Sequence, residues 1–260
     1  MADLLERLRG KERRGSKPRC HLLTHGSAVE VAARLTSLAA PFARVSSQDS
    51  WMPQGFAELE EAQLHNAARL LNPRISAQLR DWWLAPASQH GKTPNFDIAS
   101  TCTIEGVRGL LLVEAKAHDE ELNKEIAGRG LTFNASEDRK RSHTTISAAI
   151  ASAVNGLELA TSLSCRISRD SHYQMSNRFA WSWKLTELGV PVVLIYLGFL
   201  NANEMRDKGM PFADHAAWEG LVKSHSEPLF PPEVWGRQWS CNERPFIPLI
   251  RSIEQSLRED

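Results

Sequence analysis

Hydrophobic residues recur at helical spacing in several segments of the chain. Ser27 followed by Glu30 forms a capping box, and apolar positions after it recur every three or four residues. Asn72-Pro73 predicts a second helix start, because asparagine suits the N-cap and proline suits the first helical position. The pattern therefore predicts a helix from Ser27 and further helices over residues 56–71, 74–84, 144–162, 172–188 and 247–257.

Other apolar residues form short continuous runs. Gly109–Ala117 reads GLLLVEAKA and Val192–Phe199 reads VVLIYLGF, and such runs are typical of strands buried on both faces. Phe96–Ile104 is rich in residues that favour strands. Glu105–Arg108 contains Gly106, so we expect a hairpin there. Alternating helices and buried strands predict an α/β or α+β sandwich with helices on both faces of a sheet.

Composition places the chain among globular proteins. It has 260 residues, of which 42% are hydrophobic, and 31 Lys and Arg balance 31 Asp and Glu. Any nucleic-acid-binding surface must therefore come from local clusters of charge. The four cysteines lack metal-binding spacing, the start lacks a secretory apolar run, and no apolar stretch is long enough to span a bilayer. We expect a soluble cytoplasmic protein with no membrane segment.

Basic residues cluster in two segments. Residues 6–19 hold seven Lys or Arg against two Glu. Residues 118–142 are polar and contain the charged run 137–141, which predicts a mobile loop. Each segment is either solvated or a contact for phosphate groups. The candidate nucleic-acid contacts of the loop are Arg129, Arg139, Lys140 and Arg141.

The residues with the clearest chemical potential gather at one end of the predicted hairpin. Asp97 begins the first strand, and Glu114 and Lys116 end the second, two residues apart and therefore on one face. If Glu105-Gly106 is a two-residue loop, Asp97 lies opposite Glu114. If the loop has four residues, Asp97 lies opposite Lys116. In both registers all three side chains share one face, because cross-strand partners do.

Two carboxylates and an ammonium in an apolar sheet are costly unless they interact with one another or with a cation. Mg²⁺ prefers carboxylates together with water and phosphate oxygens. A lysine beside it can position or activate water and balance charge on a phosphorane. A purely structural ion pair is the alternative. A second Asp-x-Lys motif, at residues 138–140, is interpreted as solvated surface.

This pattern resembles the PD-(D/E)xK superfamily of restriction-endonuclease-like nucleases. It reads Pro94…Asp97 and then Glu114-Ala115-Lys116, with two residues between a proline and an aspartate that are usually adjacent. The resemblance covers roughly residues 55–200. It implies an α/β restriction-endonuclease-like core with a central mixed sheet flanked by helices. It also implies hydrolysis of phosphodiesters in DNA, with RNA as the alternative substrate. Mg²⁺ or Mn²⁺ would be held by Asp97, Glu114 and the Ala115 carbonyl, with Lys116 beside the attacking water.

Two further matches extend the resemblance. Family members often carry a glutamate on the first core helix, and Glu58, Glu60 and Glu61 fall on the helix expected there; we select Glu61 as a metal ligand. Many members carry a glutamine on a polar helix after the third strand. Gln174 and Arg178 lie one turn apart on such a helix. Gln174 would order the substrate or the lysine, and Arg178 would hold a phosphate. Capping of a buried helix is the alternative.

The sequence thus predicts three regions: a basic arm with a helical extension over residues 1–50, a nuclease core over 51–200, and a helical extension packed on the core over 201–260. No P-loop, dinucleotide-binding, nucleophile-elbow or HExxH motif is present. The leading hypothesis is a metal-dependent endonuclease or exonuclease. The alternative is a non-catalytic subunit that uses the same fold to bind nucleic acid or protein, as a heteromer or a homodimer. Zero net charge and a tryptophan-rich tail favour a protein partner.

Overall fold

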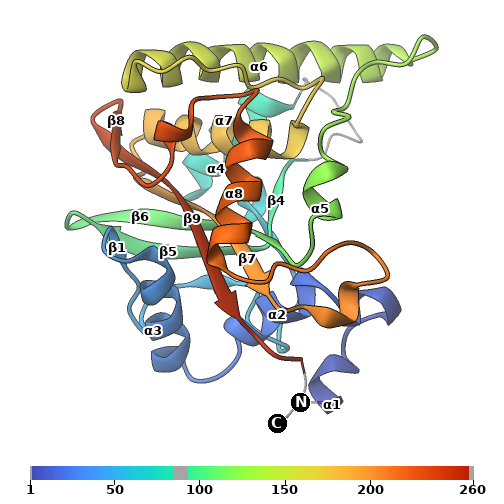
Figure 1. The fold of residues 1–260 in the computed structure, drawn as a ribbon. Helices are drawn as coiled ribbons and strands as arrows, with labels where there is room; N and C mark the ends of the chain where they lie inside the picture. Colours follow the sequence, from blue (N-terminus) through green and yellow to red (C-terminus); the bar gives the residue numbers. More distant parts are fainter. Residues whose placement is uncertain (1, 85–92, 258–260) are drawn as a thin grey trace.

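The computed structural model describes residues 2–84 and 93–257 (Figure 1). In this part of the chain a mixed sheet has the strand order β1-β5-β6-β7-β9-β8, and β2 also pairs with β5. The β5–β6 and β8–β9 pairs are antiparallel, whereas the β6–β7 and β7–β9 pairs are parallel. The strands are β1 (Ala43–Arg44), β2 (Trp51–Met52), β5 (Ile98–Ile104), β6 (Val107–Lys116), β7 (Val192–Leu200), β8 (Trp239–Cys241) and β9 (Arg244–Glu254).

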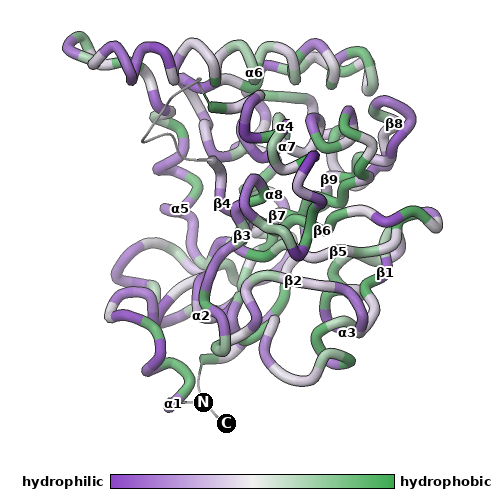
Figure 2. The backbone as a smooth tube through the Cα atoms, turned by 180° about the vertical axis from the view of Figure 1, so that it is seen from behind, coloured by the Kyte–Doolittle hydropathy of each residue, from purple (hydrophilic) through white to green (hydrophobic). Residues whose placement is uncertain are grey.

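Helices cover both faces of this sheet because the buried strands alternate between two cores. On β6, Leu110 and Leu112 enter one core, whereas Leu111 and Val113 enter the other. Figure 2 shows the central strands as predominantly hydrophobic and the start of α6 as hydrophilic. The first core is covered by α4 (Pro73–Trp83), α6 (Glu137–Thr161), α7 (Tyr173–Glu187) and α8 (His215–Ser226), and the second by α2 (Ser16–Leu23) and α3 (Ala28–Ala39). The predicted α/β class, the mixed sheet and the flanking helices are confirmed.

Most helix starts follow the capping residues of the sequence. The Ser27 side chain accepts from the Glu30 backbone N–H and the Glu30 carboxylate from that of Ser27, which confirms the capping box of α3. Asn72 caps α4 by accepting from the Ile75 N–H at 3.0 Å. The helix expected over 144–162 begins earlier, at Glu137, because the Ser136 side chain caps it. The charged run 137–141 is therefore helical rather than part of a loop, and its two leading carboxylates are stabilised by the helix dipole.

The hairpin between β5 and β6 has the two-residue loop. Ile104 pairs with Val107 and Ile98 with Val113, so the register that places Asp97 level with Glu114 is confirmed. Glu105 and Gly106 both have positive φ, at 48° and 79°. Positive φ at both central residues is the requirement of the tight turn whose twist matches the flanking strands.

The helix predicted over residues 56–71 is wrong. Ala62–Gln63 forms a short strand, β3, that pairs with β4 (Asn95–Phe96), and Leu64–Asn66 is a turn of 3-10 helix. Good helix formers such as Glu60 and Glu61 are overridden here by pairing with the segment that precedes Asp97. Another helix, α5 (Glu120–Asn123), lies in the segment expected to be a loop.

The helix predicted over residues 247–257 is also wrong, because that segment belongs to β9. This strand runs parallel to β7 and antiparallel to β8, with Ile247 in one core and Ile250 in the other. Pro248 falls in the first turn of the expected helix, where proline is tolerated, so the local sequence does not exclude a helix and the pairing of this segment with β7 and β8 decides the outcome. Residues 201–257 therefore add β8 and β9 to the central sheet as well as the helix α8, so this region is not only helical.

No helix in the described part of the chain combines the length and the apolar character needed to cross a membrane. All four cysteines are buried and free.

Candidate functional site

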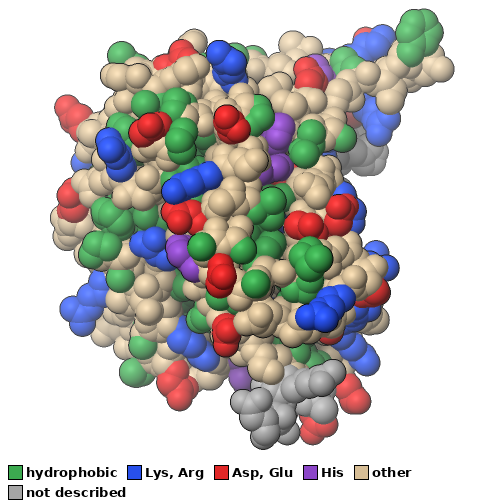
Figure 3. Space-filling view, viewed as in Figure 1, with side chains coloured by type: hydrophobic (Ala, Val, Ile, Leu, Met, Phe, Trp, Pro, Cys, Tyr) green, Lys and Arg blue, Asp and Glu red, His purple; other side chains and the backbone are tan. Residues whose placement is uncertain are grey.

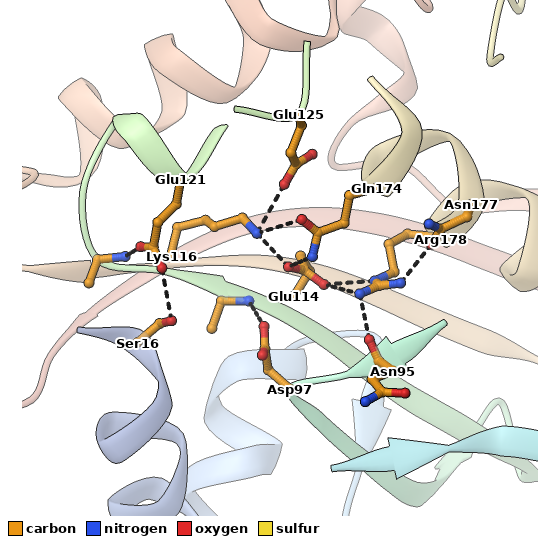
Figure 4. A network of polar contacts seen from close by, with 12 residues as sticks. Ser16, Asn95, Asp97, Glu114, Lys116, Glu121, Glu125, Gln174, Asn177 and Arg178 are labelled. Atoms are coloured by element: carbon orange, nitrogen blue, oxygen red, sulfur yellow. Dashed lines mark hydrogen bonds and ion pairs between the residues drawn. The ribbon is translucent and has the colours of Figure 1, made fainter. Parts of the chain in front are cut away.

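Asp97, Glu114 and Lys116 come together where β6 ends (Figure 4). Asp97 lies at the bend between β4 and β5, and its Oδ2 accepts a hydrogen bond from the Ala115 N–H at 2.7 Å. Glu114 and Lys116 project from the same face of β6 toward α7, and Lys116 Nζ lies 2.5 Å from Glu114 Oε1. Glu114 and Lys116 thus share one face of β6, and Asp97 reaches the same end of the strand through the Ala115 backbone.

Glu114 is the centre of the network. It is 1% exposed, and its two oxygens accept from three different side chains. Oε1 accepts from Lys116 and from the amide of Gln174, while Oε2 accepts from Arg178 Nε at 2.7 Å. Gln174 and Arg178 are one turn apart on α7, the helix expected to carry them. One helix and one strand therefore hold the carboxylate from two sides.

Arg178 is engaged by the protein itself. Its guanidinium donates to Glu114, to the Asn95 carbonyl and, at 2.6 Å, to Asn177 Oδ1, and the residue is 4% exposed. Burial opposes its charge, but Glu114 outweighs burial and raises the pKa of Arg178. A phosphate contact by Arg178 stays a prediction.

Lys116 has two hydrogen-bond acceptors and a second carboxylate as an ion-pair partner. Its Nζ donates to Glu114 Oε1 and, at 3.1 Å, to Gln174 Oε1, and lies 3.0 Å from Glu125 Oε1. Burial alone would lower the pKa of Lys116, but Glu114, Glu125 and Asp97 outweigh burial and raise it above the ordinary value. Lys116 is therefore held as an ammonium that donates hydrogen bonds.

Glu125 is a member of the site that the sequence analysis missed. It follows α5, its side chain is almost fully buried, and its Oε2 lies 3.6 Å from Nε2 of His225 on α8. Burial raises the pKa of Glu125, but Lys116 and His225 outweigh burial and lower it. No spacing in the sequence links residues 116, 125 and 225, because three separate elements bring them together.

A cleft of about 460 Å³ lies above this network. Glu114 and Lys116 lie beneath its lining residues, and Gln174, Arg178 and Glu125 connect them to it. The cleft is lined by Glu61, Thr93, Pro94, Asn95, Asp97, Glu121, Lys124, Glu125, Gly128, Arg129, Tyr173, Gln174, Asn177 and Arg178.

Glu61 reaches the cleft, although not from a helix. It precedes β3, where its Oε2 accepts from the Asn95 side chain at 3.3 Å and its Oε1 lies 3.4 Å from Lys17 Nζ. Glu58 instead pairs with Arg69 on the surface. The structure therefore places Glu61, and not Glu58, at the cleft. Glu61 reaches the cleft from the segment before β3, whereas the prediction placed it on a helix.

Only one of the predicted phosphate contacts in residues 129–141 lines the cleft. This residue is Arg129, whose guanidinium lies 5.0 Å from the centre of the Tyr173 ring. Lys140 and Arg141 pair with Glu137 and Asp138 on the exposed first turns of α6, at 2.7 and 3.4 Å.

Three of the seven cations in the basic arm pair with carboxylates in the described residues. Arg19 is buried against Glu204 at 2.5 Å, Arg14 pairs with Asp207, and Lys17 lies between Glu12 and Glu61. Residues 6–19 are therefore folded onto the protein through their charges, which leaves fewer of them for phosphate groups than the sequence suggests.

The surroundings of Asp97 carry more negative than positive charge. Burial and the neighbouring Glu114 raise the pKa of Asp97 well above its usual range. Asp97, Glu114 and Glu125 face only two cations, Lys116 and Arg178, in this network. Within the described residues Asp97 makes one hydrogen bond, through Oδ2, which leaves Oδ1 without a donor. A hard cation with oxygen ligands would offset this charge.

The donor set suits such an ion in part. Two carboxylates and a backbone carbonyl are oxygen ligands of the type that Mg²⁺ uses. In the residues described, however, no three His, Cys, Asp or Glu side chains converge as a ready metal cluster. Ion binding at Glu114 thus requires that oxygens now accepting from Lys116, Gln174 or Arg178 change partners.

Comparisons with known proteins add no relative: no family model matches the chain, and neither the curated proteins nor the solved structures contain a match. The functional argument therefore depends on the residues of this chain.

Proposed function

We propose that the protein is a metal-dependent nuclease, with a restriction-endonuclease-like core, that hydrolyses phosphodiester bonds in DNA. The observation that supports the proposal most strongly is the position of Lys116 Nζ, which lies 2.5 Å from Glu114 beside a cleft that Asp97 lines. At this point the β5–β6 hairpin and α7 bring two carboxylates, an ammonium and an amide to the wall of the cleft. RNA is the second substrate to test.

Asp97, Glu114, the Ala115 carbonyl and Glu61 are the groups that would hold Mg²⁺ or Mn²⁺. When bound, such an ion polarises a phosphoryl oxygen and lowers the pKa of a bound water. The excess of negative charge around Asp97 supports this assignment, because a buried carboxylate with a raised pKa gains from a nearby cation.

Lys116 and Gln174 act on the phosphate from the protein side. Because neighbouring carboxylates keep Lys116 protonated, it stabilises the negative charge that develops on the phosphoryl oxygens. Gln174 donates to Glu114 and accepts from Lys116, so it fixes the orientation of both groups. Glu125 holds the ammonium from the other side when Glu114 changes partners.

The test is cleavage of plasmid and linear DNA, and of RNA, with Mg²⁺ or Mn²⁺ against EDTA. Asp97→Asn, Lys116→Ala and Lys116→Arg should each lose about 100-fold or more in cleavage rate. Arginine should not replace lysine, because its planar fork cannot meet three oxygens that surround one nitrogen. Lys223→Ala, on the exposed face of α8, is the matched control and should cleave normally. Metal-independent cleavage, or a fully active Asp97→Asn variant, would contradict the proposal.

One observation favours the alternative, a non-catalytic subunit that binds nucleic acid or protein. Glu114 is 1% exposed and its oxygens already accept from three side chains, as expected of a structural ion network. Under this alternative the wild-type protein binds DNA or a partner but does not cleave nucleic acid, whichever metal ion is added. Measurement of Mn²⁺ binding by calorimetry separates the two, since a structural network should bind no ion.

A further inference from the structure

We propose that Arg129, Arg139 and Arg169 form a binding site for the phosphate groups of a nucleic-acid strand, next to the proposed cleavage cleft. The three arginines line one cavity of about 410 Å³ beside the start of α6. Figure 3 shows basic side chains on this part of the molecule, where it projects at the upper right. The choice of a nucleic-acid strand rests on the proposed function, whereas binding of phosphate groups does not. Gly130, Leu131, Thr132 and Ala135 complete the lining.

The three arginines differ from other cations of the region in having no acidic partner. Among the residues described, none of their guanidinium groups makes a hydrogen bond or an ion pair, and only Arg129 makes a cation–π contact, with Tyr173. Lys140 and Arg141, on the same helix as Arg139, pair with carboxylates three residues earlier. The cavity therefore collects three positive charges that the protein leaves open to an anion.

Arg169 is the most informative of the three. Its Nε and Nη1 atoms are shielded from solvent and have no acceptor in the part of the chain described. Asp170, its neighbour in sequence, instead places Oδ1 3.4 Å from Nε2 of His143 on α6. Shielding two nitrogens of a guanidinium from water without a partner is costly, so the site gains when an anion binds. Burial lowers the pKa of Arg169, in agreement with this shortage of negative charge.

The cavity is continuous with the cleft through Arg129, which lines both. The Arg129 N–H donates to the Arg169 carbonyl at 2.8 Å, so the two segments that carry these residues run side by side. A strand whose reacting phosphate lies at Asp97 can thus continue past Arg129 to the pair Arg139 and Arg169. An isolated phosphate ion would not need this continuity.

An exposed aromatic residue also favours a nucleic acid. Phe133 is 100% exposed in the segment that borders the cavity, and Leu131 is 46% exposed. A fully exposed phenylalanine beside open cations is the combination with which proteins stack bases and hold phosphates of single strands. We therefore favour a single-stranded segment, or a frayed end of a duplex, over an intact duplex.

The test is the salt dependence of binding of a fluorescein-labelled single-stranded oligonucleotide in EDTA, where no cleavage occurs. Arg139→Gln and Arg169→Gln should each weaken binding and reduce the slope of log K against log salt by about 0.7. Lys140→Gln and Arg141→Gln remove the same charge from α6, but both residues are already paired, so these controls should keep the wild-type slope. Arg169→Lys, which keeps the charge, shows whether a loss at position 169 reflects charge or folding, and thermal melting accompanies every variant.

An unchanged slope in Arg169→Gln, or equal losses in the controls, would overturn the proposal. Binding of inorganic pyrophosphate, followed by ³¹P NMR, tests whether the site takes a small phosphate compound instead of a nucleic-acid strand. Binding of pyrophosphate without binding of the oligonucleotide would also overturn the proposal. The outcome is separable from that of the proposed function. If the protein binds through these arginines but never cleaves, this site is retained and the nuclease proposal is rejected. If the protein is an active nuclease and its arginine variants bind normally, the nuclease proposal is retained and this site is rejected.

Discussion

Two regions of this molecule shield arginine nitrogens from bulk water. In one region these nitrogens have acceptors, and in the other they have none among the described residues. Around Glu114, the guanidinium of Arg178 has a carboxylate at 2.7 Å and further acceptors in Asn95 and Asn177. Beside α6, two shielded nitrogens of Arg169 have no acceptor in the described residues. Buried polar groups in proteins are nearly always paired, so the first arrangement is part of the fold, and the second is the observation behind the proposed phosphate site.

The largest effect that tests this comparison is expected for Glu114→Ala. The change leaves Lys116 and Arg178 buried without their shared carboxylate, and breaking a buried ion pair from one side costs about 3–5 kcal/mol. Urea unfolding of the metal-free protein measures the loss. Glu187→Ala, which removes an exposed carboxylate paired with Lys184, is the control and should cost less than about 1 kcal/mol. Equal unfolding midpoints for wild type and Glu114→Ala would mean that the network does not stabilise the fold.

Glu125→Gln tests the network around Glu114, the region in which the arginine is paired. If Glu125 holds the ammonium of Lys116 while Glu114 binds the ion, its loss misplaces Lys116 and lowers the single-turnover cleavage rate by about 100-fold. Mn²⁺ affinity should stay at the wild-type value, because Glu125 is assigned no place among the ligands. Glu125→Asp keeps the charge and should recover part of the rate. Equal cleavage by wild type and Glu125→Gln would leave Glu125 with a structural role only.

Asp97→Asn should raise stability in EDTA, and more so at higher pH. The folded protein raises the pKa of Asp97 above its unfolded value, so the folded state holds this proton more tightly. Stability therefore falls as pH increases from the ordinary aspartate pKa to the raised one, and asparagine removes that loss, by about 1 kcal/mol or more. Melting temperatures of both proteins from pH 4 to pH 9 measure the difference. A gap that shrinks as pH rises would contradict the assignment.

The smallest effect is expected for Arg169→Met. Since Arg169 has no partner to lose, its replacement should change the free energy of unfolding by less than about 0.5 kcal/mol or increase it slightly. Phosphate-containing buffer should raise the melting temperature of wild type and not that of the variant. A loss as large as that of Glu114→Ala would show that Arg169 is paired in solution and would remove the contrast between the two regions.

The local part of the site could be predicted from the sequence. The two-residue period of strands placed Asp97 opposite either Glu114 or Lys116, depending on the length of the loop, and the structure has the two-residue loop and the first register. Gln174 and Arg178 were selected through the resemblance, and their spacing of one turn on a helix is confirmed. Each of these inferences used residues close together in the sequence or one hairpin apart.

The distant part could not be predicted in this way. Glu125 follows α5 and meets Lys116 at the end of β6 and His225 on α8, and neither contact leaves a periodic trace in the sequence. Residues 62–63 lie in a segment of helical composition, but they form β3 and pair with β4, which tertiary structure decides. The last strand is decided in the same way, because Pro248 suits the first turn of a helix and only the pairing with β7 and β8 makes this segment a strand.

The place of β9 has a consequence for how the protein is made. This strand is late in the chain, at Arg244–Glu254, but it lies between β7 and β8 inside the sheet. While a ribosome is still translating the residues before it, β7 has an uncovered edge, and the core residues of β7 lack Ile247, Leu249 and Ile250. Domains fold as units, so β6, which carries Glu114 and Lys116, is not fully enclosed until this segment leaves the ribosome. The network around Glu114 is therefore completed only after residues 244–254 join the sheet.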